Sequence, residues 1–305
     1  MTALTTPREG IPRVLSTPAD FTAAASALAS GQGPLAIDTE RASGFRYDDR
    51  AFLVQIRRRD VGTFLLDPEG ARPEFTAALA PVLNGQDWII HAAPSDLPSL
   101  AWLGLYPGTL FDTELAGRLA GFDHVNLAAM IEMLFDVHLA KGHGAEDWSQ
   151  RPLPADWLAY AALDVELLLE LGDTMAEILD GQGKLDWASQ EFEYIRRGHA
   201  SITGPTESTW RAMKGVSSLT RPEQLAVARE LWMTRESIAV ADDRAVSRIL
   251  PTKVLIEVAR TLPRTSRDLA RVKGFPARRR SAVRFWGEVI DRALGSDPRT
   301  WPKRE

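Results

Sequence analysis

The stretch Leu35 to Glu40 contains the residues best suited to chemistry. It has the pattern of an apolar strand that ends in two carboxylates, Asp38 and Glu40, separated by one residue. Side chains alternate between the faces of a strand, so Asp38 and Glu40 point to the same side. Two carboxylates so close repel each other unless a proton or a cation lies between them. Oxygen ligands favour magnesium or manganese; the alternative is a solvated acidic strand end.

Further carboxylates follow along the chain. Asp96 comes after the apolar strand 88–91, at a helix start where the helix dipole also favours an acid. Asp112 ends a short strand, where an N-cap role is the simpler interpretation. Tyr160 and Asp164 are four residues apart and share one face of a predicted helix, on an otherwise apolar stripe. A buried carboxylate is costly unless it is paired or metal-bound, so Asp164 indicates either a functional site or a buried Asp bonded to Ser, Thr or backbone groups.

The elements that position these residues follow from hydrophobic periodicity and from turn residues. The predicted strands cover residues 34–40, 52–57, 62–66, 88–91 and 110–112. The predicted helices cover 18–30, 73–83, 96–103, 113–120, 126–135 and 154–180, and Thr17 is the predicted N-cap of the first. The second and third strands are expected to form an antiparallel hairpin. Residues 1–15 are predicted to be irregular. The order of these elements predicts an α/β fold with a mixed five-stranded sheet and flanking helices.

The end of the chain has a different character. After about residue 205 only helices are predicted, over 221–239, 251–260, 266–272 and 276–294. Gly204 and Pro205 interrupt the helical pattern, which predicts a first domain over residues 1–205, a linker over 206–217 and a small all-helical domain over 218–305. A bundle of this size buries enough apolar surface to fold alone.

The charge is divided in the same way. Residues 206–305 hold 21 Lys and Arg against 12 Asp and Glu, whereas residues 1–205 hold 15 against 29, which together give the net charge of −5. The basic side chains cluster around one turn and the following helix, and the candidates for phosphate contact include Lys273, Arg278 and Arg279. The helical domain is therefore a candidate surface for a polyanion, the alternative being a solvated basic face.

The composition excludes several classes of protein. The chain has no cysteine, so disulfides, thiolate nucleophiles and cysteine-bound zinc are all excluded. No apolar run is long enough to span a membrane, and the N-terminus lacks the pattern of a signal peptide. These features predict a cytoplasmic protein with no membrane partner.

Taken in order, the motifs resemble the ribonuclease D family, within the 3′–5′ exonucleases that have four acidic ligands. The resemblance is carried by residues 36–40, 53–56, 91–97, 111–113 and 147–153, the last leading into 160–164. One branch of these enzymes has a His five residues before the last Asp, where this chain has Ala159, and the other has a Tyr four residues before, where it has Tyr160. The apolar spacing of the tail and Lys273-Gly274-Phe275 are similar to the HRDC domain.

The resemblance implies a ribonuclease H-like fold and a two-metal site. Two Mg²⁺ ions, for which Mn²⁺ can substitute, would be held by Asp38, Glu40, Asp96 and Asp164. Asp38 would bridge the ions, and Asp96 would hold the second one. Tyr160 would orient the attacking water, because its ordinary pKa near 10 does not suit it as a base. Substrate contacts are expected from Thr39, Gln55, His91, Trp148 and Arg151, although His91 is more simply a core histidine.

The implied activity is a metal-dependent 3′–5′ exoribonuclease that releases nucleoside 5′-monophosphates from RNA with a free 3′ end, in the processing of tRNA or other stable RNAs or in decay. The same chemistry suits a DNA exonuclease acting on single-stranded DNA, because two-metal phosphoryl transfer does not involve the sugar. A catalytically silent nucleic-acid-binding scaffold is a third hypothesis. The presence of all four acids and the tyrosine argues against it.

Overall fold

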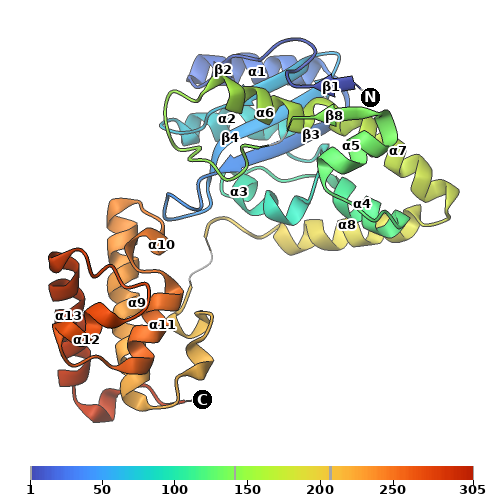
Figure 1. The fold of residues 1–305 in the computed structure, drawn as a ribbon. Helices are drawn as coiled ribbons and strands as arrows, with labels where there is room; N and C mark the ends of the chain where they lie inside the picture. Colours follow the sequence, from blue (N-terminus) through green and yellow to red (C-terminus); the bar gives the residue numbers. More distant parts are fainter. Residues whose placement is uncertain (1, 141, 206–207, 305) are drawn as a thin grey trace. The chain divides into compact units, whose positions relative to one another are not determined.

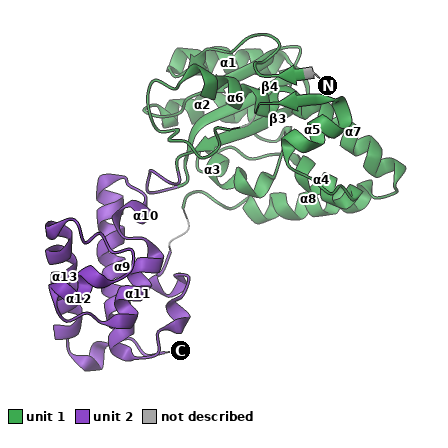
Figure 2. Ribbon diagram, in the orientation of Figure 1, with its two compact units in different colours: residues 1–42, 49–205 green, residues 43–48, 206–305 purple. Residues whose placement is uncertain are grey.

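The computed structural model describes residues 2–140, 142–205 and 208–304. The chain divides into two compact units, shown in different colours in Figure 2. The first consists of residues 1–42 and 49–205, and the second of residues 43–48 and 206–305. No helix in the described ranges is long and apolar enough to cross a membrane.

The first unit is built on a six-stranded sheet with the strand order β2-β5-β4-β3-β6-β7. The strands are β2 (Val14–Leu15), β3 (Gln32–Arg41), β4 (Ala51–Arg59), β5 (Gly62–Leu66), β6 (Asp87–Ile90) and β7 (Thr109–Asp112). β3 and β4, like β4 and β5, pair antiparallel, whereas β3–β6 and β6–β7 are parallel. The mixed sheet is thus confirmed, and so is the predicted β4–β5 hairpin.

The number of strands differs from the predicted five. Residues 14–15, predicted to be irregular, form β2, which pairs in parallel with the end of β5. A separate parallel pair joins β1 (Thr2–Leu4) to β8 (Val137–Leu139). Both additions are very short strands whose pairing partners lie far away in the sequence, so their local sequence carries little signal.

Helices flank the sheet in Figure 1. They are α1 (Pro18–Ser30), α2 (Arg72–Leu83), α3 (Leu97–Ala101), α4 (Thr113–Ala120), α5 (Leu127–Phe135), α6 (Ala155–Glu166), α7 (Leu168–Gly181) and α8 (Leu185–His199), with the short 3₁₀ helix η1 (Ala93–Ser95). Thr17 caps α1 through a capping box with Asp20. The helix predicted over 154–180 is interrupted at Leu167, whose backbone leaves helical geometry, and becomes α6 and α7.

The core of this unit holds the strand ends in place. Leu35, Ala36 and Ile37 of β3 are fully buried, and Phe21 of α1 meets Phe75 of α2 edge-on with ring centroids 5.2 Å apart. Burial of each such aliphatic or aromatic side chain contributes about 1.5–3 kcal/mol. The next residues of β3, which carry the carboxylates, therefore extend from a rigid strand.

The second unit is all-helical. It consists of α9 (Pro222–Asp242), α10 (Val246–Ile249), α11 (Thr252–Thr261), α12 (Ser266–Arg271) and α13 (Arg280–Gly295), with the 3₁₀ helices η2 (Trp210–Ala212), η3 (Val216–Ser218) and η4 (Pro298–Thr300). Leu231, Leu255 and Trp286 lie in its core. The predicted linker does not have the expected character, because Met213 is buried in this core; its first two residues, 206 and 207, lie outside the described part of the chain.

The loop of residues 43–48, which connects β3 to β4, also groups with the second unit, contrary to the predicted domain 1–205. The backbone amide of Ala245 donates to the carbonyl oxygen of Phe45 at 3.0 Å, and the Tyr47 hydroxyl donates to Glu236 of α9 at 3.1 Å. These contacts join residues about 200 positions apart, and hydrophobic periodicity cannot predict them because it depends only on neighbouring residues.

Candidate active site

Three carboxylates meet where β3 ends. Asp38, Glu40 and Asp164 each offer an oxygen, and these oxygens all lie within 4.8 Å of one another. Asp38 and Glu40 share a face because they are two residues apart on β3, and Asp164 comes from α6, which packs against that strand. A site of this kind needs ligands from separate elements, because one strand end cannot surround an ion.

Asp96 approaches from the loop after β6. The Thr39 hydroxyl donates to its Oδ1 at 2.6 Å, and Nη1 of Arg41 lies 3.2 Å from the same oxygen. Thr39 lies between Asp38 and Glu40 on β3 and points to the other face, whereas Arg41 follows an irregularity in the β3–β4 pairing at the strand end. β3 therefore supplies two ligand candidates, Asp38 and Glu40, and two anchors for Asp96. Both bonds involve Oδ1, and no residue in the described part of the chain bonds to the second oxygen of Asp96, so that oxygen is available for a cation.

Asp112 fixes the loop that leads to Asp96. Its carboxylate accepts hydrogen bonds from the backbone amides of Ala92 and Ala93 at 3.2 and 2.9 Å, and from those of Glu114 and Leu115 at 2.9 and 3.1 Å. The predicted N-cap role on α4 is confirmed. The bonds to residues 92 and 93 were not predicted; they stabilise a loop in which Ala92 adopts the left-handed conformation, with φ of 59°.

Burial and mutual repulsion dominate the electrostatics of the site. Burial, followed by the charges of neighbouring carboxylates, raises the pKa of Asp38 and of Glu40 well above their ordinary values. Burial raises the pKa of Asp96 to about 6 and that of Asp164 to about 7. Clustered carboxylates that hold protons this strongly favour a divalent cation in their place, and an all-oxygen donor set fits Mg²⁺ or Mn²⁺.

Tyr160 lies one helical turn before Asp164 on α6, and its hydroxyl group is close enough to that carboxylate to interact with it electrostatically. Burial, together with the charges of Asp164, Glu40 and Asp38, raises the pKa of Tyr160 further above 10. The phenol therefore keeps its proton at neutral pH in the metal-free protein. It can donate a hydrogen bond and orient a neighbouring group, but it is not a base there.

The structure contradicts two of the predicted substrate contacts. Trp148 is fully buried and donates its indole N–H to the carbonyl oxygen of His143 at 3.1 Å, so its ring is not available to stack on a base. Arg151 binds both oxygens of Asp67, at 2.5 and 2.8 Å, and three backbone carbonyl oxygens. These bonds engage all five N–H groups of Arg151, so it holds the loop before α6 together and has no donor left for phosphate.

Of three other candidates, Gln55 and Thr39 are buried and His91 is half-buried. Gln55 is fully buried and its amide donates to Glu40 at 3.4 Å, so it contacts a ligand candidate rather than open space. The Nδ1 atom of His91 lies 2.8 Å from the Thr113 hydroxyl, and burial lowers the pKa of His91 to about 4, which supports the core interpretation. The side chain of Thr39 is used by Asp96, and its predicted backbone contact with a nucleotide remains a prediction.

The remaining candidates, Lys273, Arg278 and Arg279, lie in the second unit. All three are exposed, at the end of α12 and in the turn that leads into α13. Lys273 precedes and Arg278 and Arg279 follow Phe275, whose buried side chain belongs to the core of that unit. Their exposure leaves them available to a polyanion.

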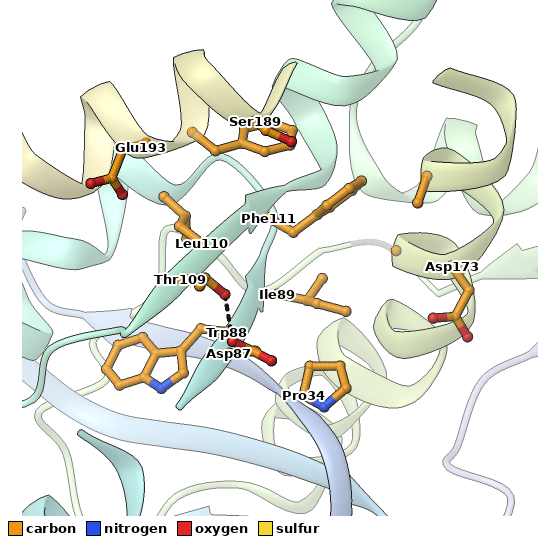
Figure 3. Close-up of a pocket in the computed structure, with 13 residues that line it drawn as sticks. Pro34, Asp87, Trp88, Ile89, Thr109, Leu110, Phe111, Asp173, Ser189 and Glu193 are labelled. Atoms are coloured by element: carbon orange, nitrogen blue, oxygen red, sulfur yellow. Dashed lines mark hydrogen bonds between the residues drawn. The ribbon is translucent and has the colours of Figure 1, made fainter. Parts of the chain in front are cut away.

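A different recess, of about 480 Å³, lies where β6 and β7 begin and where α7 and α8 pass over them (Figure 3). Its floor is apolar, and its rim contains Asp87, Asp173 and Glu193. Each of these carboxylates is paired with a neighbouring side chain, as the bond from Thr109 to Asp87 in Figure 3 illustrates. The recess contains none of the candidate residues, so it is not the site of the carboxylate chemistry.

The carboxylate cluster predicts how stability responds to pH and to metal. Because the folded-state pKa values of Asp96 and Asp164 are raised, their contribution to stability is fully present below about pH 4 and is lost as the pH rises through about 7. Metal-free protein is therefore expected to melt about 5 °C lower at pH 7.5 than at pH 5. Mn²⁺ should reverse the loss at pH 7.5 and have little effect at pH 5, where protons compete for the ligands.

Calorimetry of EDTA-treated protein, with and without added Mn²⁺, measures this response. The variant Asp164→Asn should show a smaller pH dependence, because one of the two groups is then uncharged throughout. An equal response to Mn²⁺ at both pH values would contradict the assignment of these carboxylates as a proton-holding cation site.

Comparison with known proteins supports the interpretation of the site. The sequence model of the 3′–5′ exonuclease family matches residues 12–180, and that of the HRDC domain matches residues 224–287. Ribonuclease D of Gluconacetobacter diazotrophicus is 34% identical over 188 residues, which cover 61% of this chain and 47% of that protein. Ribonuclease D of a Jannaschia species is 30% identical over 268 residues, covering 86% and 68% of the two chains. The chain thus spans about half of the first relative and about two thirds of the second.

Solved structures share the fold. A protein from Bifidobacterium adolescentis is 36% identical, with a TM-score of 0.84 over 99% of this chain and 78% of that one. Ribonuclease D of Escherichia coli is 24% identical, with a TM-score of 0.73 over 96% and 77% of the chains. NrnC of Brucella melitensis, in a structure with bound Mg²⁺, is 25% identical, with a TM-score of 0.51 over 66% and 92%.

A mixed sheet with three carboxylates converging at one strand end, and a fourth, Asp96, nearby on the loop after β6, fits a 3′–5′ exonuclease domain, and a basic helical domain follows it. The chain belongs to the ribonuclease D family of 3′–5′ exonucleases, with a C-terminal HRDC domain.

Proposed function

We propose that this protein is a metal-dependent 3′–5′ exoribonuclease that removes nucleoside 5′-monophosphates one at a time from RNA with a free 3′ end. The observation that carries the proposal is the convergence of Asp38, Glu40 and Asp164, with oxygens within 4.8 Å, next to an Asp96 whose second oxygen remains available. Structured or stable RNAs are the proposed substrates, as the family suggests.

Two Mg²⁺ ions are the proposed cofactors, with Mn²⁺ as a substitute. Asp38, Glu40 and Asp164 would hold one ion, Asp38 would also face the second, and Asp96 would hold the second. When bound, such ions stabilise the charge that develops on the phosphate and lower the pKa of a coordinated water. The carboxylates of this chain supply the negative charge that selects cations, and their partial burial strengthens that attraction.

Tyr160 has a separate proposed role. Its hydroxyl lies near Asp164 and keeps its proton at neutral pH in the metal-free protein, so it can orient the attacking water by a hydrogen bond without removing a proton. Two hydrogen bonds hold ligand candidates in position: Gln55 donates to Glu40, and Thr39 donates to Asp96. A rigid, oriented constellation of this kind lowers the barrier because little reorganisation is needed during the reaction.

The HRDC domain is proposed to hold the RNA. The exposed Lys273, Arg278 and Arg279 can contact phosphates, which adds affinity but no sequence information. Binding should therefore weaken steeply as salt increases. A cytoplasmic location remains a prediction from the sequence, and cell fractionation would test it.

The direct test is a time course on 5′-labelled single-stranded RNA with Mg²⁺, with Mn²⁺ and with EDTA. The expected result is a ladder that shortens by single nucleotides and is abolished by EDTA. A DNA strand of the same sequence serves as the matched substrate. Cleavage of DNA alone would assign a DNA exonuclease, and intact RNA and DNA with both metals would support the silent scaffold.

A further inference from the structure

Arg41 is a charged residue of the site that has no role in the proposed reaction as described above. It ends β3, directly after Glu40, and its Nη1 atom contacts Oδ1 of Asp96 at 3.2 Å and the carbonyl oxygen of Ser95. Its side chain is 26% exposed. In the part of the chain that the structure describes, its Nε and Nη2 atoms have no hydrogen-bond partner, so three N–H groups remain available beside the carboxylate cluster.

The position of Arg41 gives it two opposing electrostatic effects. Its positive charge acts on Asp38, Glu40 and Asp96, where it opposes the rise in pKa that burial causes. A guanidinium does not lose its proton in proteins, so this charge is permanent. It must repel a cation approaching Asp96, and it must attract a phosphate arriving at the same place. The planar fork of Nε and Nη2 matches two phosphate oxygens.

We propose that Arg41 binds the phosphate on the 5′ side of the last nucleotide of the RNA and thereby makes cation binding at Asp96 depend on bound substrate. A phosphate on Nε and Nη2 neutralises the charge that otherwise repels the cation, so both ligands bind better together than apart. This coupling is reciprocal, because each ligand must strengthen the other by the same factor. The inference rests on the proposed function and adds a substrate-binding residue that controls loading of the second cation.

A purely structural role for Arg41 predicts the opposite result. If Arg41 only oriented Asp96, its removal would weaken cation binding at that carboxylate. If its charge controls loading, removal should strengthen cation binding in the absence of substrate. Arg41→Gln distinguishes the two roles, because the amide of glutamine can still donate a hydrogen bond to Asp96 but carries no charge.

The test counts Mn²⁺ ions bound per chain by electron paramagnetic resonance of the free ion, with and without 5′-AMP, a reaction product that carries the phosphate. In the wild type, AMP is expected to tighten binding of the second Mn²⁺ about tenfold, equivalent to about 1.4 kcal/mol. In Arg41→Gln, the second Mn²⁺ should bind about tenfold more tightly without AMP, and AMP should change that affinity less than threefold. AMP itself should bind about tenfold more weakly.

The matched control is Arg118→Gln, which removes an exposed arginine paired with Glu114 on α4. It should leave both Mn²⁺ affinities and the AMP effect unchanged, and melting curves confirm that both variants are folded. Equal or weaker binding of the second Mn²⁺ in Arg41→Gln, or an undiminished AMP effect, would overturn the inference alone. Failure of the wild type to bind Mn²⁺ at all would instead overturn the proposed function.

Discussion

Asp38→Asn is expected to lower kcat for RNA cleavage by about 10³-fold or more, the largest effect of any single substitution in this chain. Asp38 is central to the cluster. It shares a face with Glu40, one of its oxygens lies within 4.8 Å of an oxygen of Asp164, and it interacts electrostatically with Asp96. Asparagine keeps the size and one oxygen of the side chain but loses the charge that attracts cations. Single-turnover cleavage of 5′-labelled RNA in saturating Mn²⁺ measures the loss.

The same substitution should stabilise the metal-free protein. Removing one buried carboxylate relieves the repulsion that raises the pKa of Asp38 and Glu40, so the melting temperature in EDTA should rise by a few degrees at pH 7.5. Loss of activity with a gain in stability separates a functional residue from a structural one. The control is Asp123→Asn at an exposed position, which should change neither quantity. Full activity of folded Asp38→Asn would refute the assignment.

Tyr160→Phe is expected to lower kcat by about 10²-fold, the second largest effect. The substitution removes only the hydroxyl that interacts with Asp164, and the ring still fills its place on α6. Since the proposed task of the hydroxyl is to orient a water and not to hold a cation, Mn²⁺ affinity should stay within about threefold of the wild type. Rapid-quench kinetics and Mn²⁺ titrations measure the two quantities separately.

The pH profile gives a second readout for Tyr160. In the metal-free protein, burial and the neighbouring carboxylates raise the pKa of Tyr160 above its ordinary value, so we expect a different group to limit the rate between pH 6 and 9. The profile of Tyr160→Phe should therefore have the same shape as that of the wild type, at a lower level. Loss of one limb of the profile in the variant would show instead that the tyrosine titrates during the reaction.

The amino-acid sequence by itself determined the local framework of the site. An apolar run before Asp38-x-Glu40 specified a buried strand with both carboxylates on one face, because strand alternation depends only on neighbouring residues. Helical periodicity likewise placed Tyr160 and Asp164 one above the other on α6. Thr17 and Asp112 were recognisable as helix caps for the same reason, since capping is a contact over two or three residues.

Only the tertiary structure decided which polar residues face open space. Trp148 and Arg151 are residue types that often contact nucleic acids. In the structure, however, Trp148 is buried, and all the donors of Arg151 are engaged by Asp67 and by backbone oxygens. Arg41 is an ordinary charge in the sequence and becomes part of the site because Asp96, 55 residues away, lies against it. Packing of the whole domain determines contacts between residues this far apart in the sequence. Sequence periodicity predicts only which face of its own helix or strand a residue occupies.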